Sequence, residues 1–127
     1  MKKQINQVKT FHETFEVGIK EGPQFPDEAT QQLRNRLLQE ELDELKEAVA
    51  NNDLVEVADA LVDIQYLLCG TILEYGMQDK FEALFDEVHR SNMSKLDENG
   101  KPVRRADGKV IKSELFSPPA LKEILED

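Results

Sequence analysis

Acidic side chains are concentrated in two short stretches of this chain. The first stretch is Glu40–Glu44, in which only Leu42 is not acidic, and the second is Glu56–Asp59, with Asp63 one helical turn further on. A short break at Asn51–Asp53 separates the two helical patterns that carry these stretches. Two antiparallel helices would therefore bring four or more carboxylates together. Carboxylates held together repel one another unless a positive charge lies between them, and a hard divalent cation typical of phosphate chemistry is the obvious partner.

Helical periodicity separates the acids of the first stretch into two groups. At 100° per residue, Glu41 and Glu44 fall on an apolar flank of the helix, and Glu40 lies at the edge of that flank. Asp43 and Glu47 point to the opposite, solvated side. Acids that interrupt a buried flank need a partner, so Glu41 and Glu44 are the unusual members of this stretch.

The second stretch shows the same anomaly on the next helix. Glu56, Asp59 and Asp63 stand at positions i, i+3 and i+7, which places them in one narrow strip. The rest of that helix is apolar over most of its circumference, and we expect it to be central and well buried.

Each group of acids also has a simpler explanation. Glu41 and Glu44 could reach water at the edge of their helix. Glu56 and Asp59 could be N-terminal acids that complement the helix dipole, and Glu56 could belong to a capping box. Their combination on neighbouring helices, with basic residues later in the chain, favours a metal site.

The elements that must position these residues are helices. Hydrophobic periodicity predicts an all-α fold, an antiparallel bundle of four long helices within one domain over residues 1–127. The helices are expected over about residues 3–20, 27–50, 53–75 and 78–95, with Asp27 and Asp53 as N-caps. Turn pairs at Asn99-Gly100 and Asp107-Gly108 predict an ordered loop or small hairpin within the basic segment of about 96–117. A short helix is expected over 120–125.

Composition narrows the function classes. The formal net charge of −10 argues against duplex nucleic acid as a partner. We find no apolar stretch long enough to span a membrane and no signal peptide. The single cysteine, Cys69, lies in an apolar helical run and is interpreted as a buried thiol in a reducing cytoplasm.

The order of the acidic motifs resembles a known signature. Glu40-Glu41-x-x-Glu44 followed by Glu56-x-x-Asp59 is similar to the motifs of the all-α nucleoside triphosphate pyrophosphohydrolases, which include MazG-like proteins and phosphoribosyl-ATP pyrophosphohydrolases. The stretch Val88–Lys95, with Asp107–Lys112 after it, resembles a bacterial and phage branch described as phosphoribosyl-ATP pyrophosphohydrolase-like. The resemblance covers helices two to four and the basic segment.

This resemblance implies that a (d)NTP or related nucleotide is hydrolysed at its α–β linkage to a monophosphate and pyrophosphate. It implies that Mg²⁺, or Mn²⁺ in its place, is held by Glu41, Glu44, Glu56 and Asp59. Asp63 is either a further ligand or support, with a simple salt bridge as the alternative. Glu40, beside the ligands, is the candidate to orient or deprotonate the attacking water.

Phosphate contacts are expected from the later part of the chain. Asn92 and Lys95 match the motif of the branch and are our first candidates, as a neutral donor and a point charge. Lys109 and Lys112 follow them, although exposed lysines beside a turn are often simply solvated.

Two other functions stay open at this point. The chain could be a non-catalytic helical dimerisation module with a structural metal, or a phosphoribosyl-ATP pyrophosphohydrolase of histidine biosynthesis. Because the third helix is apolar on too many sides for a lone monomer, we expect a homodimer, and the resemblance also allows a homotetramer.

Overall fold

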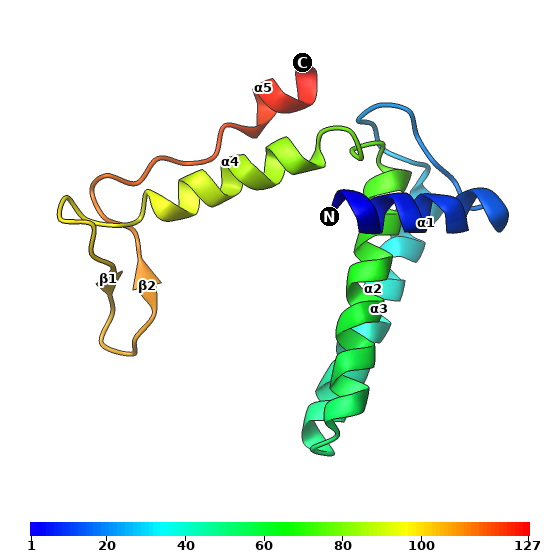
Figure 1. Cartoon of the computed structure of the whole chain (residues 1–127), viewed down its shortest axis with the longest axis horizontal. Helices are drawn as coiled ribbons and strands as arrows, with labels where there is room; N and C mark the ends of the chain where they lie inside the picture. The colour runs from blue at the N-terminus through cyan, green and yellow to red at the C-terminus, as the bar shows by residue number, and fades with distance from the viewer. The chain divides into compact units, whose positions relative to one another are not determined.

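Two long helices joined by a tight turn form a hairpin in the structure, a computed structural model that describes residues 1–127 (Figure 1). These are α2 (Glu28–Ala50) and α3 (Leu54–Glu74). The chain reverses direction at Asn51–Asp53, where Asn52 takes a left-handed φ of 52°. The two helices therefore run antiparallel and in contact along their length.

Side-chain caps fix the start of both helices. Asp27 accepts a hydrogen bond from the backbone N–H of Thr30 at 2.8 Å, and Asp53 accepts one from that of Glu56 at 3.1 Å. Each bond satisfies one of the N–H groups that have no partner within a helix, which stabilises a helix by about 1 kcal/mol. The predicted N-caps are confirmed.

Helix α1 (Lys2–Thr14) packs on α3 and is shorter than the sequence predicts. It was expected to reach residue 20, but Glu16 takes a left-handed φ of 57° and the N–H of Val17 bonds back to the carbonyl of His12 at 2.8 Å. The helix thus ends at Thr14, six residues earlier than expected, and the chain continues as an irregular segment to Asp27.

The core lies where α1 crosses the second half of α3. Cys69 and Leu73 of α3 are fully buried there, and Ile5 and Val8 of α1 are buried as well. The first half of α3 is different, since Leu54 is 80% exposed. The expectation of a well-buried third helix is therefore wrong for this half within a single chain.

The chain consists of two compact units, Met1–Asp79 and Lys80–Asp127. The second unit contains α4 (Phe81–Met93), β1 (Val103–Arg104), β2 (Val110–Ile111) and α5 (Leu121–Glu126). The strands pair antiparallel, with Val103 opposite Ile111, so the small hairpin is confirmed.

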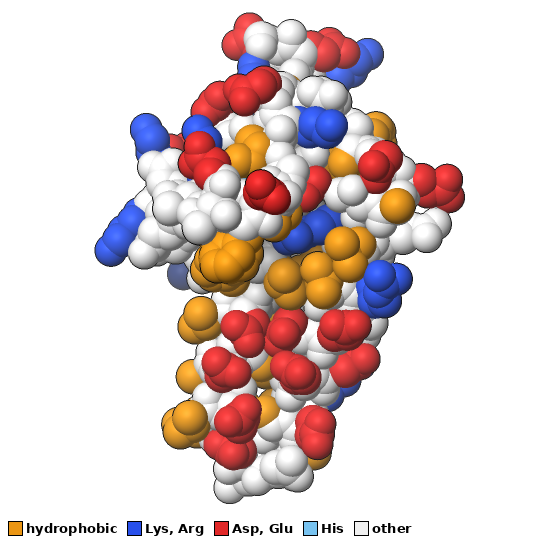
Figure 2. All heavy atoms as spheres, turned by 90° about the vertical axis from the view of Figure 1, so that its right-hand side faces the viewer, with side chains coloured by type: hydrophobic (Ala, Val, Ile, Leu, Met, Phe, Trp, Pro, Cys, Tyr) orange, Lys and Arg blue, Asp and Glu red, His pale blue; other side chains and the backbone are white.

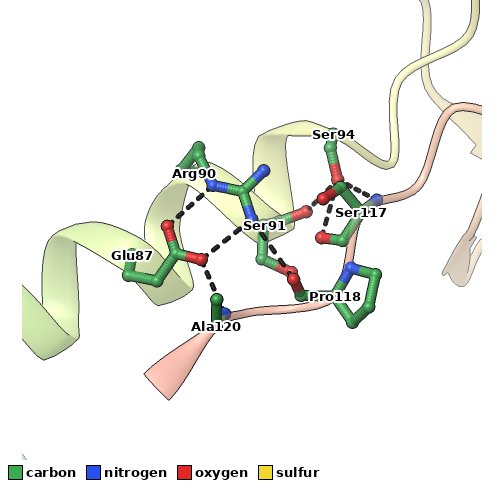
Figure 3. A network of polar contacts seen from close by, with 7 residues as sticks. All are labelled: Glu87, Arg90, Ser91, Ser94, Ser117, Pro118 and Ala120. Carbon is green, nitrogen blue, oxygen red and sulfur yellow. Dashed lines mark hydrogen bonds and ion pairs between the residues drawn. The ribbon is translucent and has the colours of Figure 1, made fainter. Parts of the chain in front are cut away.

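A polar network holds the segment before α5 against α4 (Figure 3). Glu87 forms an ion pair with Arg90 at 2.7 Å and accepts a hydrogen bond from the backbone N–H of Ala120 at 2.7 Å. The hydroxyl of Ser94 accepts another from the N–H of Ser117 at 2.8 Å. These contacts order the C-terminal segment.

The all-α prediction with four long helices, a hairpin and a short last helix is confirmed. The prediction of a single domain over residues 1–127 stays a prediction. None of the helices combines the length and the apolar character that crossing a membrane requires.

Candidate metal centre

Three carboxylates from the two antiparallel helices meet at one point. Glu41 and Glu44 on α2 and Asp63 on α3 each offer an oxygen, and these oxygens all lie within 4.8 Å of one another. Glu41 and Glu44 share a face because they are three residues apart, and Asp63 faces them across the helix pair. The structure therefore brings together three of the five predicted ligands.

Burial and repulsion between neighbouring carboxylates dominate the electrostatics of this cluster. Oε2 of Glu41 is buried and has no hydrogen-bond partner. Burial raises the pKa of Glu41 to about 7, and the neighbouring carboxylates of Glu44, Asp63 and Asp59 add to the rise. Burial, with Asp59 and Glu44 nearby, also raises the pKa of Asp63. A divalent cation fits this set, because hard oxygen donors with an unpartnered buried oxygen are what Mg²⁺ and Mn²⁺ bind.

The other two predicted ligands border an acidic cavity next to the cluster. Glu56 and Asp59 line a cavity of ≈ 380 Å³, and Glu44 lines it as well, so the cavity adjoins the carboxylate cluster. Its size is within the range of small-molecule sites. Acidic side chains gather over this part of the α2–α3 hairpin, in the lower half of Figure 2. Phosphate groups could enter so negative a cavity only together with cations.

Glu47 borders this cavity but was not among the site residues predicted from the sequence. We expected it to be solvated with Asp43; its side chain is exposed, and it also lines the cavity with Glu44 and Glu56. The available signal was its position three residues after Glu44, which places it one turn further along α2.

Glu40 was predicted to orient or deprotonate the attacking water. It lies on α2 outside the three-carboxylate cluster. Its side chain is exposed, in contrast to the half-buried Glu41 beside it. An exposed carboxylate at the edge of a cation site can reach water without serving as a ligand.

All four predicted phosphate contacts belong to the second unit. Asn92 is exposed in the last turn of α4, and Lys95 is half-buried just after the helix. Lys109 is exposed at the hairpin turn, where its backbone N–H bonds to Asp107. The ammonium group of Lys112 lies 4.5 Å from the centre of the Phe116 ring, a cation–π contact.

The helices that carry the carboxylates match a known protein family. A family model described as phosphoribosyl-ATP pyrophosphohydrolase matches residues 8–92. The match spans the second half of α1, all of α2 and α3, and α4 up to Asn92, so it includes every carboxylate of the cluster and the cavity. No curated protein matches the chain.

Proposed function

The chain belongs to the phosphoribosyl-ATP pyrophosphohydrolase family, and from that premise we propose that it is a Mg²⁺-dependent enzyme that cleaves the α–β linkage of a nucleoside triphosphate or related nucleotide. The family match covers more than half of the chain. Its members are hydrolases of acid anhydrides, so the chain is a nucleotide pyrophosphohydrolase of the MazG-like superfamily.

One observation supports the metal assignment above the others. The carboxylates of Glu41, Glu44 and Asp63 converge, and one buried oxygen of Glu41 has no partner. We assign these three as ligands, with Glu56 and Asp59 completing the set from the wall of the adjoining cavity. Mg²⁺, or Mn²⁺ in its place, would neutralise the charge that builds on the phosphate oxygens during hydrolysis.

Side chains of the protein carry out the remaining steps of the proposed hydrolysis. Glu40 orients the attacking water and accepts its proton, since it is exposed next to the ligands. Attack at the α-phosphorus then releases pyrophosphate and leaves the monophosphate. Asn92, Lys95, Lys109 and Lys112 remain the predicted phosphate contacts, as N–H donors and positive charges.

A homodimer or homotetramer is part of the proposal. The exposed first half of α3 carries an apolar surface that a single chain leaves in water. A second copy would cover it and remove the unfavourable contact with solvent.

Product analysis tests the function directly. Purified protein with Mg²⁺ is incubated with a panel of common and modified nucleoside triphosphates and with phosphoribosyl-ATP, the substrate in the description of the family. We expect pyrophosphate and a monophosphate, and loss of at least about a hundredfold in rate for Glu40→Gln, the scale of a lost general base. Release of single phosphate groups, or no turnover of any panel member, would overturn the proposal and favour a non-catalytic metal-binding module.

A further inference from the structure

A charged side chain is buried between α2 and α3, outside the three-carboxylate cluster. Arg34 of α2 is only 6% exposed. Its Nε donates to the hydroxyl of Thr71 at 3.1 Å and its Nη2 donates to the carbonyl of Leu67 at 2.8 Å. Thr71 itself donates to the same carbonyl at 2.8 Å. The guanidinium thus ties one position of α2 to one turn of α3.

The surroundings leave the guanidinium little freedom. A Cβ atom at residue 70 would overlap Arg34 Nη2 and would lie 2.9 Å from His12 Nε2, so any side chain in place of Gly70 would displace the guanidinium. His12 of α1 is also buried, and its Nδ1 donates to the carbonyl of Gly18 at 2.9 Å. Burial lowers the pKa of Arg34, and the charge of the buried Glu74 opposes that effect. Three helices therefore enclose one fixed guanidinium.

The position of this contact along the helix pair links it to the carboxylates. Arg34 precedes Glu41 by seven residues, and Leu67 follows Asp63 by four, so each pair shares a helix face. The tight turn at Asn51–Asp53 closes the other end of the pair. The carboxylate cluster therefore lies between a covalent connection at one end and the Arg34 contact at the other.

Charge repulsion within the carboxylate cluster opposes the packing of α2 against α3. Its carboxylates repel one another across the interface when no cation is bound. A slip of one residue moves a side chain by about 1.5 Å along a helix axis, whereas oxygen ligands of Mg²⁺ must lie within narrow limits of about 2.0–2.1 Å from the ion. Apolar contacts between helices resist such a slip only weakly, because they are not directional, but two hydrogen bonds to fixed acceptors oppose it.

We propose that Arg34 is a positioning residue, which holds α2 and α3 in the register at which Glu41 and Glu44 meet Asp63. The metal role of these acids rests on the proposed function above. Arg34 touches neither the cation nor the substrate. It acts through the two helices that carry the ligands.

The test measures metal affinity of the folded protein rather than activity. Mn²⁺ binding is followed by electron paramagnetic resonance, at a temperature where circular dichroism shows each variant fully folded. We expect Arg34→Met to raise the Kd about tenfold or more, on the scale of outer groups that orient metal ligands. Arg34→Lys should recover part of the affinity, because its ammonium group retains one donor toward Leu67. The matched control is Arg36→Met, since Arg36 is exposed on the same helix and has no hydrogen bond or ion pair.

Thr71→Val provides a second variant that does not depend on the folding of Arg34→Met. It removes the acceptor of Nε while nearly conserving side-chain volume, and we expect the Kd to rise about two- to tenfold, the effect of one hydrogen bond. A purely structural contact would lower the unfolding midpoint and leave the Kd of the folded protein unchanged.

The two proposals fail in different ways. If the wild-type protein binds no Mn²⁺, or if Glu41→Gln leaves binding intact, the proposed metal site is wrong. If the wild-type protein binds Mn²⁺ through Glu41 and folded Thr71→Val binds it equally well, the positioning role of Arg34 is wrong.

Discussion

Glu41 combines a buried oxygen without a partner with three neighbouring acids. Its pKa is about 7 in the folded chain, against 4.5 for an ordinary glutamate. Between these values the folded state binds more protons than the unfolded state. The stability of the metal-free protein therefore falls as pH rises through this window, and in the proposed metal site the same residue becomes a better ligand.

Metal affinity should follow the deprotonation of Glu41. We expect Mn²⁺ affinity to increase from about pH 5 and to level off above about pH 7, with protons released on binding in the rising part. Calorimetric titration in two buffers of different ionisation enthalpy measures the released protons. An affinity that does not change with pH would contradict the role of Glu41 as a ligand.

Substitution of the same residue should separate stability from function. Glu41→Gln removes a repelled charge and keeps the shape, so the metal-free variant should have a higher urea midpoint than the wild type at pH 8, while its metal affinity falls at least about tenfold. Asp43→Asn is the control, because Asp43 is exposed and bonds only to Gln39 at 2.9 Å. A lower midpoint for Glu41→Gln than for the control would show that the charge is not destabilising.

At the scale of elements, the end of α3 depends on a glycine. The N–H of Gly76 bonds to the carbonyl of Leu73 at 3.1 Å, and that of Met77 bonds to the carbonyl of Ile72 at 3.0 Å, which is a Schellman motif. Gly76 has a φ of +68°, and a Cβ there would overlap the carbonyl oxygen of Gly22. Only glycine satisfies both conditions.

Gly76→Ala should therefore destabilise the unit Met1–Asp79 by about 2 kcal/mol or more, from left-handed strain plus a backbone clash. Urea denaturation measures the change. Gly22→Ala is the matched control and should change stability by less than about 0.5 kcal/mol, since no atom lies within 4 Å of its added Cβ. Equal effects of the two substitutions would contradict this account of the helix end.

In the second unit, Glu87 connects α4 to the segment before α5. Hydrogen bonds from Arg90 and from the N–H of Ala120 lower its pKa to about 2. A depressed carboxyl pKa contributes stability that is present above about 4.5 and is lost as pH falls toward 2. The hydrogen bonds that Glu87 accepts from Arg90 and Ala120 should therefore persist at mildly acidic pH.

Loss of this contact should release the C-terminal segment without changing the metal site. We expect Glu87→Gln to speed hydrogen exchange and proteolysis at residues 117–120, with Mn²⁺ affinity unchanged. Glu82→Gln, an exposed acid in the first turn of α4, is the control. Unchanged protection in Glu87→Gln would mean that other contacts hold the segment.

At the scale of the whole molecule, α3 carries an exposed apolar stripe. Leu54, Leu61 and Leu68 recur every seven residues, and Val55 and Val62 repeat beside them. This spacing is typical of a helix that packs along another helix. The stripe supports the proposed self-association.

Light scattering after size exclusion tests this stripe. The wild type should have the mass of a dimer or tetramer, and Leu61→Glu combined with Val62→Glu should shift it toward the 14.5 kDa monomer, because two buried charges destabilise an apolar interface. Val110→Glu in the hairpin, a valine that is also exposed, is the control. A wild-type monomer at all concentrations would overturn the oligomer proposal.

The sequence by itself determined the features that depend on neighbours within one or two helical turns. The caps at Asp27 and Asp53 and the narrow strip of Glu56, Asp59 and Asp63 follow from local hydrogen bonds and from 3.6-residue periodicity. The family signature needed only this local order. For the same reason, two antiparallel helices with facing acids could be predicted without a structure.

Only the tertiary structure decided which polar groups are buried and what they contact. From the sequence alone, Arg34 has the features of an ordinary surface base. It lies on the same helix face as Glu41, and the carbonyl that accepts its hydrogen bond, that of Leu67, is 33 residues away. Glu47 lines the cavity, and Glu41 acquires a pKa of about 7 because packing buries it, with smaller effects from Glu44, Asp63 and Asp59. Burial and charge repulsion depend on residues brought together by packing, and their sequence separation exceeds the range of any local pattern.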